Sequence, residues 1–300
     1  MDKKTLSNYG WIVAVILILS IMIALATPFA MAVKNGVVGA ANGFVGHANG
    51  ALKYSFEEHT WESMGGGSDL GDNSGGEQLP AGGEVSEAGE ILDSWEVIIN
   101  NVNNGTYSTK YAVGNYKPLD LGSEGVVNMQ IAALDTDIMS DGSGNAHITW
   151  IAKELLATKH NMNSTKTNAN GWEASEMRTY LQTDIWALID PTVQNAIVAV
   201  DKTYYDHTTS STKTCSDKVW IPSYREVGFG TGVENDGIIY SELFTDNASR
   251  IKYQNGTASS WWLRSARTVF SDHFYDVFPD GNWNSNYTNF TYGVALSFCF

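Results

Sequence analysis

The longest apolar run of the chain lies close to its start. It extends from Trp11 to Ala26, its apolar character continues to Val33, and Lys3 and Lys4 precede it. A helix over this run, at 1.5 Å per residue, is long enough to span the ~30 Å hydrocarbon core of a membrane. Basic residues on its amino side predict that this side lies in the cytoplasm and that everything afterwards is exported.

Two other interpretations of the apolar run stay open. Ala30-Met31-Ala32 provides the small-x-small exit of a cleaved signal peptide. Gly10 before the run resembles the processing point of type IV pilin-like precursors, although Val15 stands where most such pilins carry glutamate. We therefore favour a membrane anchor first, a pilin-like subunit second and a cleaved signal third.

Composition divides the rest of the chain. After a cytoplasmic tip and membrane helix over residues 1–33, we expect a juxtamembrane stalk over 34–63, a linker over 64–90 and a folded domain over 91–300. The linker is dense in Gly, Ser, Glu and Asp and nearly lacks large apolar residues. It therefore cannot bury enough surface to offset the entropy of ordering.

Apolar spacing in the folded domain predicts the α+β class, with helices followed by short strands and irregular segments. Residues 91–99 fit either a helix or a strand. Residues 107–116, 126–134 and 219–222 are typical of strands bounded by turn residues.

Helical spacing occurs in three further segments. Ile148, Ile151 and Leu155 share one face of a predicted helix over 146–156. An apolar stripe predicts a second helix over 174–189, and Asp190-Pro191 provides the cap and first turn of a third, shorter helix.

The last forty residues have an unusual composition. Twelve of them are Phe, Trp or Tyr, about 30% against 12% for the whole chain. Apolar residues at both ends, Trp261-Trp262 and Val294 to Phe298, are typical of half-buried strands. Between these ends aromatic and polar residues follow no period, apart from a turn at Asp280-Gly281. Such a mixture is typical of binding loops, because Tyr offers a large rigid contact area and Ser, Asn and Gly adapt their hydrogen bonds.

The same tail is depleted in one set of residue types. Trp, Gln, Met, Lys and Glu make up 51 of 300 residues, so four or five are expected between Ala266 and Tyr292, yet only Trp283 occurs there. A codon that ends in a pyrimidine encodes none of these five.

Three sequence motifs carry a resemblance. The run Trp261 to Ser265, then Asp280 to Asn284, then Gly293-Val294-Ala295 with a terminal Phe-Cys-Phe, resembles the variable region of target proteins of diversity-generating retroelements. In that family a reverse transcriptase copies a template with errors at adenines, so that asparagine codons are changed into codons for other residues, such as those seen in this tail. The resemblance implies a C-type-lectin-like ligand-binding domain, related in fold to formylglycine-generating enzymes, with a variable region at about 261–300.

The upstream runs 171–178 and 221–226, together with the Trp-Trp-Leu-Arg-Ser run, also resemble a domain of unknown function common in gut bacteria. That second resemblance covers roughly residues 92–300 and implies no particular activity.

The resemblance also divides the tail into a binding face and a scaffold. Trp283, the segment from Trp261 to Ser265 and the segment from Gly293 to Phe298 are expected to hold the scaffold. The binding face is expected to comprise sixteen residues: Arg267, Thr268, Phe270, Ser271, Asp272, His273, Tyr275, Asp276, Phe278, Asn284, Ser285, Asn286, Tyr287, Asn289, Phe290 and Tyr292.

Charge and residue types exclude some function classes. The net charge is -15 and only 18 residues are basic, which argues against a nucleic-acid partner because phosphate binding needs clustered Lys and Arg. The six histidines show no zinc spacing, and no nucleophile elbow, phosphate loop or dinucleotide fingerprint occurs. We therefore expect no metal, no cofactor and no enzyme activity, with calcium binding left open because its acidic and carbonyl ligands leave little signature in a sequence. Cys215 and Cys299 are too few for a disulfide scaffold, and whether they form one bridge stays open.

These observations favour a surface-displayed ligand-binding protein of a bacterium or its phage. It would be adhesin-like or receptor-like, anchored by the apolar helix with its C-terminal domain outside the cell, and would bind a protein or glycan on another cell or phage. A pilin-like filament subunit is the second hypothesis, and an exported enzyme of the formylglycine-generating type is the third.

Overall fold

The computed structural model describes residues 52–55, 60–63, 82–230 and 236–300. The chain forms two units, residues 1–76 and 77–300. In the first unit, β1 (Leu52–Ser55) and β2 (Thr60–Ser63) form an antiparallel hairpin. The predicted membrane, pilin-like or signal helix lies outside the described residues, and within those residues no helix is long and apolar enough to cross a membrane.

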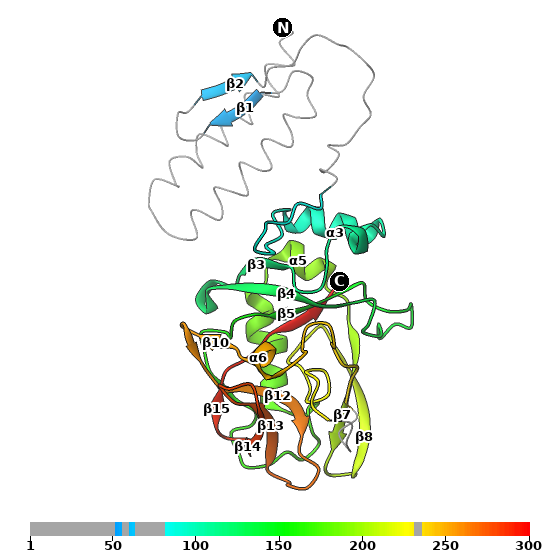
Figure 1. The fold of residues 1–300 in the computed structure, drawn as a ribbon, viewed down its shortest axis with the longest axis vertical. Coiled ribbons are helices and arrows are strands. Elements are labelled where there is room, and N and C mark those ends of the chain that lie inside the picture. Colours follow the sequence, from blue (N-terminus) through cyan, green and yellow to red (C-terminus); the bar gives the residue numbers. More distant parts are fainter. Residues whose placement is uncertain (1–51, 56–59, 64–81, 231–235) are drawn as a thin grey trace, which may run out of the picture. The chain divides into compact units, whose positions relative to one another are not determined.

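The second unit is built on a five-stranded antiparallel sheet (Figure 1). The last strand of the chain, drawn in red, lies between two strands from earlier parts of the sequence. In spatial order the strands are β3 (Tyr116–Asp120), β4 (Val126–Leu134), β5 (Ile148–Ala152), β16 (Ser297–Cys299) and β9 (Val219–Trp220).

The helix predicted over 146–156 is wrong, because this segment forms β5. All five residues of the strand are buried. Ile148, Trp150 and Ala152 pack into one hydrophobic core cluster and Ile151 into a second, so both faces of the strand are covered. A strand that is covered on both faces has no polar alternation, and its apolar spacing therefore fits a helix equally well.

The helices lie where the capping residues indicate. Ser94 caps α3 (Trp95–Asn103), which settles the open choice for 91–99 in favour of a helix. The predicted helix over 174–189 is confirmed as α4 (Glu176–Tyr180), continued by η3 (Leu181–Ile185) and η4 (Trp186–Leu188). Asp190 caps α5 (Pro191–Ala196) by accepting a hydrogen bond from the Thr192 amide, as predicted. A fourth short helix, α6 (Asn247–Arg250), precedes the C-terminal strands.

The strand predicted over 107–116 is wrong. Tyr107 and Tyr111 are both buried and lie four residues apart, which is the spacing of one helical turn. The Tyr111 amide donates to the Tyr107 carbonyl at 2.8 Å, and a short helix, η1 (Tyr107–Thr109), takes the place of the strand. A similar turn, η2 (Gly122–Glu124), joins β3 to β4.

The smaller sheets surround this framework. Together with the helices and the central sheet they make the domain α+β, as predicted. The remaining strands are β6 (His160–Asn161) paired with β15 (Thr291–Tyr292), β7 (Val200–Asp206) paired with β8 (Ser211–Asp217), β10 (Tyr253–Gln254) paired with β11 (Thr257–Ala258), and the three-stranded sheet β12 (Trp261–Ala266), β13 (His273–Val277) and β14 (Trp283–Tyr287).

A buried charge network joins distant segments of the domain. The Arg264 guanidinium binds the Glu226 carboxylate through both terminal nitrogens, one of them at 2.9 Å. Lys202 lies between Glu226 at 3.1 Å and Asp137 at 2.5 Å, and its ammonium sits 3.9 Å from the Trp220 ring. Buried charges need such pairing, since an unpaired charge in the interior is very costly. The network therefore fixes how these segments pack.

The two cysteines do not form a bridge. Cys215 and Cys299 are both free and buried. Burial raises the pKa of the Cys215 thiol to about 12. A thiol in this state is a small apolar side chain in the core and is a poor nucleophile.

Candidate functional site

The candidate site lies on the β13–β14 hairpin near the C-terminus (Figure 1). The predicted turn at Asp280-Gly281 is confirmed, since β13 and β14 pair antiparallel on either side of it. The expectation of binding loops is confirmed only in part: residues 267–272, 278–282 and 288–290 form turns and loops, whereas β13 and β14 take up the segments between them. The absence of a period has a physical reason: both faces of the hairpin carry a mixture of polar and aromatic side chains.

Gly281 fixes this turn against α6. Its φ is +80°, and a Cβ atom there would lie 1.8 Å from the carbonyl oxygen of Asn247. The Asn247 side chain also donates to that of Asn282 at 2.7 Å. Only glycine permits both this backbone conformation and this close approach.

The segment 162–168 holds the loops on both sides of the hairpin. Asn168 is fully buried, and its amide nitrogen donates to the carbonyls of Phe270 at 2.7 Å and His273 at 2.8 Å. In the turn that follows β14, the buried Thr288 hydroxyl donates to the Thr165 carbonyl at 2.7 Å. The loops are therefore fixed to the scaffold by side chains as well as by strand pairing.

One face of the hairpin carries a connected row of rings. Cross-strand pairing places His273 opposite Tyr287 and Tyr275 opposite Ser285. The His273 ring lies 4.9 Å from Phe270 and 4.4 Å from Tyr287, and Tyr287 lies 5.8 Å from Phe290. These distances are typical of favourable aromatic pairs, so the row is preorganised. We call this row, with Trp283, Tyr275 and Tyr224, the aromatic face.

Arg267 lies in the middle of the aromatic face. Its guanidinium carbon is 5.2 Å from the centre of Phe270 and 5.5 Å from those of Tyr275 and Trp283. It donates a hydrogen bond to the Ser285 hydroxyl at 2.7 Å. Among the described residues no carboxylate forms an ion pair with Arg267. The aromatic face therefore presents a cation held among three rings.

The opposite face of the hairpin is polar and is built around a buried acid. Asp276 is fully buried and accepts a hydrogen bond from the Asn286 amide at 3.2 Å. Burial raises the pKa of Asp276 to about 7, despite the hydrogen bond from Asn286. This carboxyl group is therefore partly protonated near neutral pH.

The structure brings most of the sixteen predicted residues to the surface of one hairpin and its flanking turns. Tyr275 is only 6% exposed and Asp276 is not exposed at all, so these two lie beneath the surface. The other fourteen are at least partly exposed: Arg267, Thr268, Phe270, Ser271, Asp272, His273, Phe278, Asn284, Ser285, Asn286, Tyr287, Asn289, Phe290 and Tyr292.

Several residues of the site escaped the sequence reasoning. Trp283 was expected to hold the scaffold, but it is 44% exposed and lies on the aromatic face. Lys166, whose ammonium is 3.9 Å from the Tyr287 ring, and Asn168 come from a polar segment that reads as an ordinary loop. Tyr224 lies 4.3 Å from Tyr275, although they are far apart in sequence. Nothing in the sequence indicates that these segments meet.

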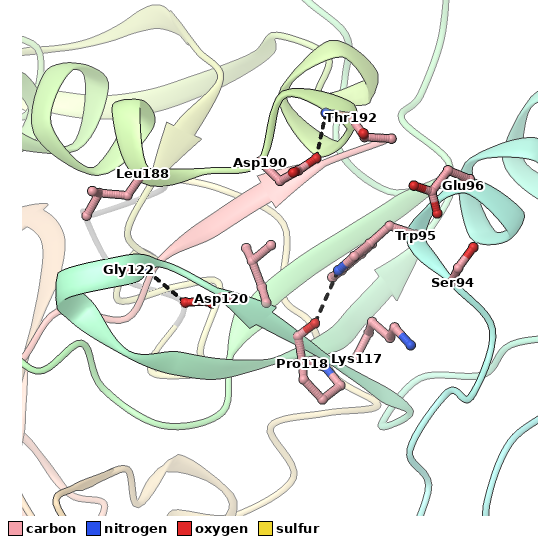
Figure 2. Close-up of a pocket in the computed structure, with 11 residues that line it drawn as sticks. Ser94, Trp95, Glu96, Lys117, Pro118, Asp120, Gly122, Leu188, Asp190 and Thr192 are labelled. Atoms are coloured by element: carbon pink, nitrogen blue, oxygen red, sulfur yellow. Dashed lines mark hydrogen bonds between the residues drawn. The ribbon is translucent and has the colours of Figure 1, made fainter. Parts of the chain in front are cut away.

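A separate groove lies between the start of α3, β3 and the start of α5 (Figure 2). Its volume is about 670 Å³, and none of the sixteen predicted residues lines it. As Figure 2 shows, several of its polar groups already have local partners: the Trp95 indole donates to the Pro118 carbonyl at 3.1 Å, and Asp120 accepts from the Gly122 amide at 2.9 Å. We therefore read this groove as a structural junction. Within the described part of the chain, no cluster of His, Cys, Asp and Glu could hold a metal ion.

Comparison with known proteins adds one finding. No curated protein and no solved structure matches the chain. A family model for a domain of unknown function, DUF6273, matches residues 147–299 and so includes the aromatic face, the segment 162–168 and the buried charge network except Asp137. Because this match spans just over half of the 300 residues, the chain belongs to the DUF6273 family.

Proposed function

We propose that this protein is a surface-displayed ligand-binding protein, adhesin-like or receptor-like, that binds its ligand through the aromatic face. One observation carries the proposal. Within residues 82–230 and 236–300, six aromatic side chains are exposed, and four of them, Phe270, Trp283, Tyr287 and Phe290, belong to the aromatic face. Exposed apolar groups gathered on one rigid surface are typical of interaction sites. Tyr and Trp also contribute most of the energy in many interfaces.

The proposal includes a lectin-like fold and diversification by a retroelement. Two features of the hairpin support it. The segment depleted in Trp, Gln, Met, Lys and Glu contains the exposed turns and strands of the site, whereas β12 and β16 on either side of it are buried. A diversified region needs this arrangement, because changes at exposed positions alter binding and leave packing intact.

The location outside the cell and the anchoring by the N-terminal helix remain part of the proposal, since they depend on residues outside the described ones. A membrane or pilin-like helix would display the domain away from the cell. The free cysteines and the buried charge network give no specific support to an enzyme.

Binding by the full-length protein tests the proposed function. The probes are a displayed library of random peptides and an array of immobilised glycans. We expect at least one probe to bind, and Trp283→Ala to weaken that binding about tenfold or more, because a truncated aromatic hot spot typically has this effect.

Tyr253→Ala provides the matched control, since Tyr253 is 48% exposed but lies in β10, outside the aromatic face. Equal losses for Trp283→Ala and Tyr253→Ala, or no binding to either probe set, would refute the proposal.

Deep sequencing of the gene across codons 261–300 in a population of one strain tests diversification separately. Changes confined to codons of the aromatic face and its turns, at adenines of a nearby template repeat, are expected. An invariant tail without a template repeat would remove the retroelement from the proposal and leave the binding surface to be judged on the probes.

A further inference from the structure

β14 is an edge strand. It pairs with β13 on one side, and within the described residues no strand pairs with its other side. Its sequence is Trp-Asn-Ser-Asn-Tyr, without proline or a charged residue. Natural edge strands are usually protected by charges, proline or bulges, because their free backbone groups attract further strands. β14 lacks these protective features.

The alternation of hydrogen-bonded pairs along the hairpin shows which backbone groups of β14 point away from β13. The Phe278 amide donates to the Asn282 carbonyl and the Thr288 amide to the Asp272 carbonyl, both pairs lying just beyond the strand ends. Because hydrogen-bonded pairs alternate along an antiparallel ladder, Asn284 and Asn286 direct their backbone groups toward β13. Trp283, Ser285 and Tyr287 direct theirs to the open edge, where the Tyr287 carbonyl already accepts a hydrogen bond from the Phe290 amide at 3.0 Å.

The same three residues direct their side chains to the aromatic face. They are paired with Val277, Tyr275 and His273, and paired residues share one face of a sheet. A strand added at this edge would therefore place the residue opposite Ser285 between Trp283 and Tyr287. The side chain of that residue would lie beside Arg267, which already binds the Ser285 hydroxyl.

Charge defines the ligand further. The chain carries a net charge of -15, yet Arg267 and Lys166 on this face have no carboxylate partner among the described residues. We propose that the open edge of β14 binds an extended peptide segment of a partner protein, and that an acidic side chain of this segment, opposite Ser285, pairs with Arg267. Main-chain hydrogen bonds would supply affinity, and contacts with the aromatic face would supply specificity, as in other cases of strand addition. This inference rests on the proposed function and names the class of its ligand.

Three pools of capped heptapeptides test the peptide chemistry. Each pool has β-branched and aromatic residues randomised at six positions, and glutamate, glutamine or lysine fixed at the centre. We expect the full-length protein to bind the glutamate pool about tenfold more tightly than the glutamine pool, and the lysine pool least, because like charges across an interface are unfavourable. Arg267→Gln should remove the preference for glutamate over glutamine.

N-methylation of a selected peptide tests strand addition. Alternate amides of an added strand face β14, and the others face solvent. We expect methylation of one alternating set to weaken binding at least about tenfold and methylation of the other set to be tolerated. Equal effects of the two sets, or equal binding of the glutamate and glutamine pools, would overturn the inference.

A proline variant tests the edge itself. Ser285→Pro removes a backbone donor that faces outward, and proline is tolerated at such edge positions. It should weaken peptide binding much more than Ser285→Ala, which removes only the side-chain hydroxyl. Thr212→Pro is the control. The Asp201 amide of β7 donates to the Ile138 carbonyl, away from β8, so Asp201 is not hydrogen-bonded to its partner in β8. Because hydrogen-bonded pairs alternate along the ladder, the Thr212 amide also points away from β7, to the outer edge of β8. If Ser285→Pro fails to fold, the methylated peptides on the unmodified protein still decide.

Binding of a glycan but of no peptide pool would refute this inference and leave the proposed function standing. Binding of no probe at all would refute both. The peptides could also bind without any preference for glutamate or for one methylation pattern, and Trp283→Ala could abolish that binding. This result would refute the inference of strand addition and would support the proposed function.

Discussion

β12 and β14 flank the same strand, β13, but differ completely in their surroundings. All six residues of β12 are buried, whereas all five residues of β14 are at least partly exposed. The difference extends to two arginines only three positions apart. Arg264 is fully buried and binds Glu226 through both terminal nitrogens, while Arg267 lies among rings and binds only the Ser285 hydroxyl. One edge of this sheet is therefore a framework, and the other edge displays side chains.

This difference indicates which substitutions the domain can tolerate. In β12 each large side chain fills a space and satisfies distant polar groups, so a substitution leaves a cavity or an unpaired charge. In β14 every side chain is at least partly exposed, so a substitution changes the surface offered to a ligand. The comparison becomes testable when the same substitution is made on both sides.

The largest difference is expected between Arg264→Met and Arg267→Met. The first leaves the buried Glu226 with Lys202 as its one remaining cation partner among the described residues, and breaking a buried ion pair typically costs ~3–5 kcal/mol. The second removes a partly exposed group without an ion pair and should cost less than ~1 kcal/mol. Urea unfolding of both variants measures the difference. Similar losses would mean that Arg264 does not have the structural role assigned to it.

The folding stability should depend on pH through Asp276, the buried acid of the β13–β14 hairpin. Burial raises the pKa of Asp276 to about 7, so the folded protein holds this proton more tightly than the unfolded chain. The resulting stability is fully present below pH ~4 and is lost as the pH rises toward ~7. Asp276→Asn mimics the protonated group and should be more stable than the unmodified protein by roughly 2–4 kcal/mol at pH 8, with little difference at pH 4.

Asp236 acts in the same direction, because burial raises its pKa to about 6. The measurement is therefore the difference in unfolding free energy between Asp276→Asn and the unmodified protein from pH 4 to pH 8, in which the contribution of Asp236 cancels. A difference that is constant over this range would contradict the elevated pKa of Asp276.

The turn between β13 and β14 allows a third matched pair. Gly281 and Gly256 have similar φ values of +80° and +76°, but a Cβ atom would clash only at Gly281, since no atom lies within 4 Å of a Cβ at Gly256. Gly281→Ala should therefore cost about 3 kcal/mol through strain and steric overlap, and Gly256→Ala about 1 kcal/mol through strain alone. Thermal unfolding of both variants checks this. Equal costs would show that α6 yields to the extra methyl group.

Local signals made much of the scaffold predictable from the sequence. The strand over 126–134, the helical stretch over 174–189 and the Asp190-Pro191 cap each depend on the spacing of near neighbours, and the structure contains all three. The same signals failed where tertiary contacts decide. β5 reads as a helix because both of its faces are covered by distant segments.

The site was predictable in its position but not in its construction. Composition alone indicated the exposed stretch, yet the support from Asn168 depends on three carbonyls about one hundred residues away, and no local pattern encodes such contacts. Trp283 was assigned to the scaffold on the resemblance to retroelement target proteins. Its exposure follows from its place on an edge strand, which only the strand pairing reveals.

The smallest effect on stability is expected at Trp283, the first residue of β14. Trp283 is 44% exposed and Trp262 is fully buried, so Trp283→Ala should cost less than about 1 kcal/mol while Trp262→Ala costs ~3–5 kcal/mol. The order should reverse in binding assays, because Trp283 lies on the aromatic face and Trp262 lies in the core. Measurements of unfolding and of peptide binding for both variants therefore test whether β14 is a binding strand or a structural one. A large loss of stability in Trp283→Ala would mean that β14 is structural, like β12, and would remove the distinction between the two edges of the sheet.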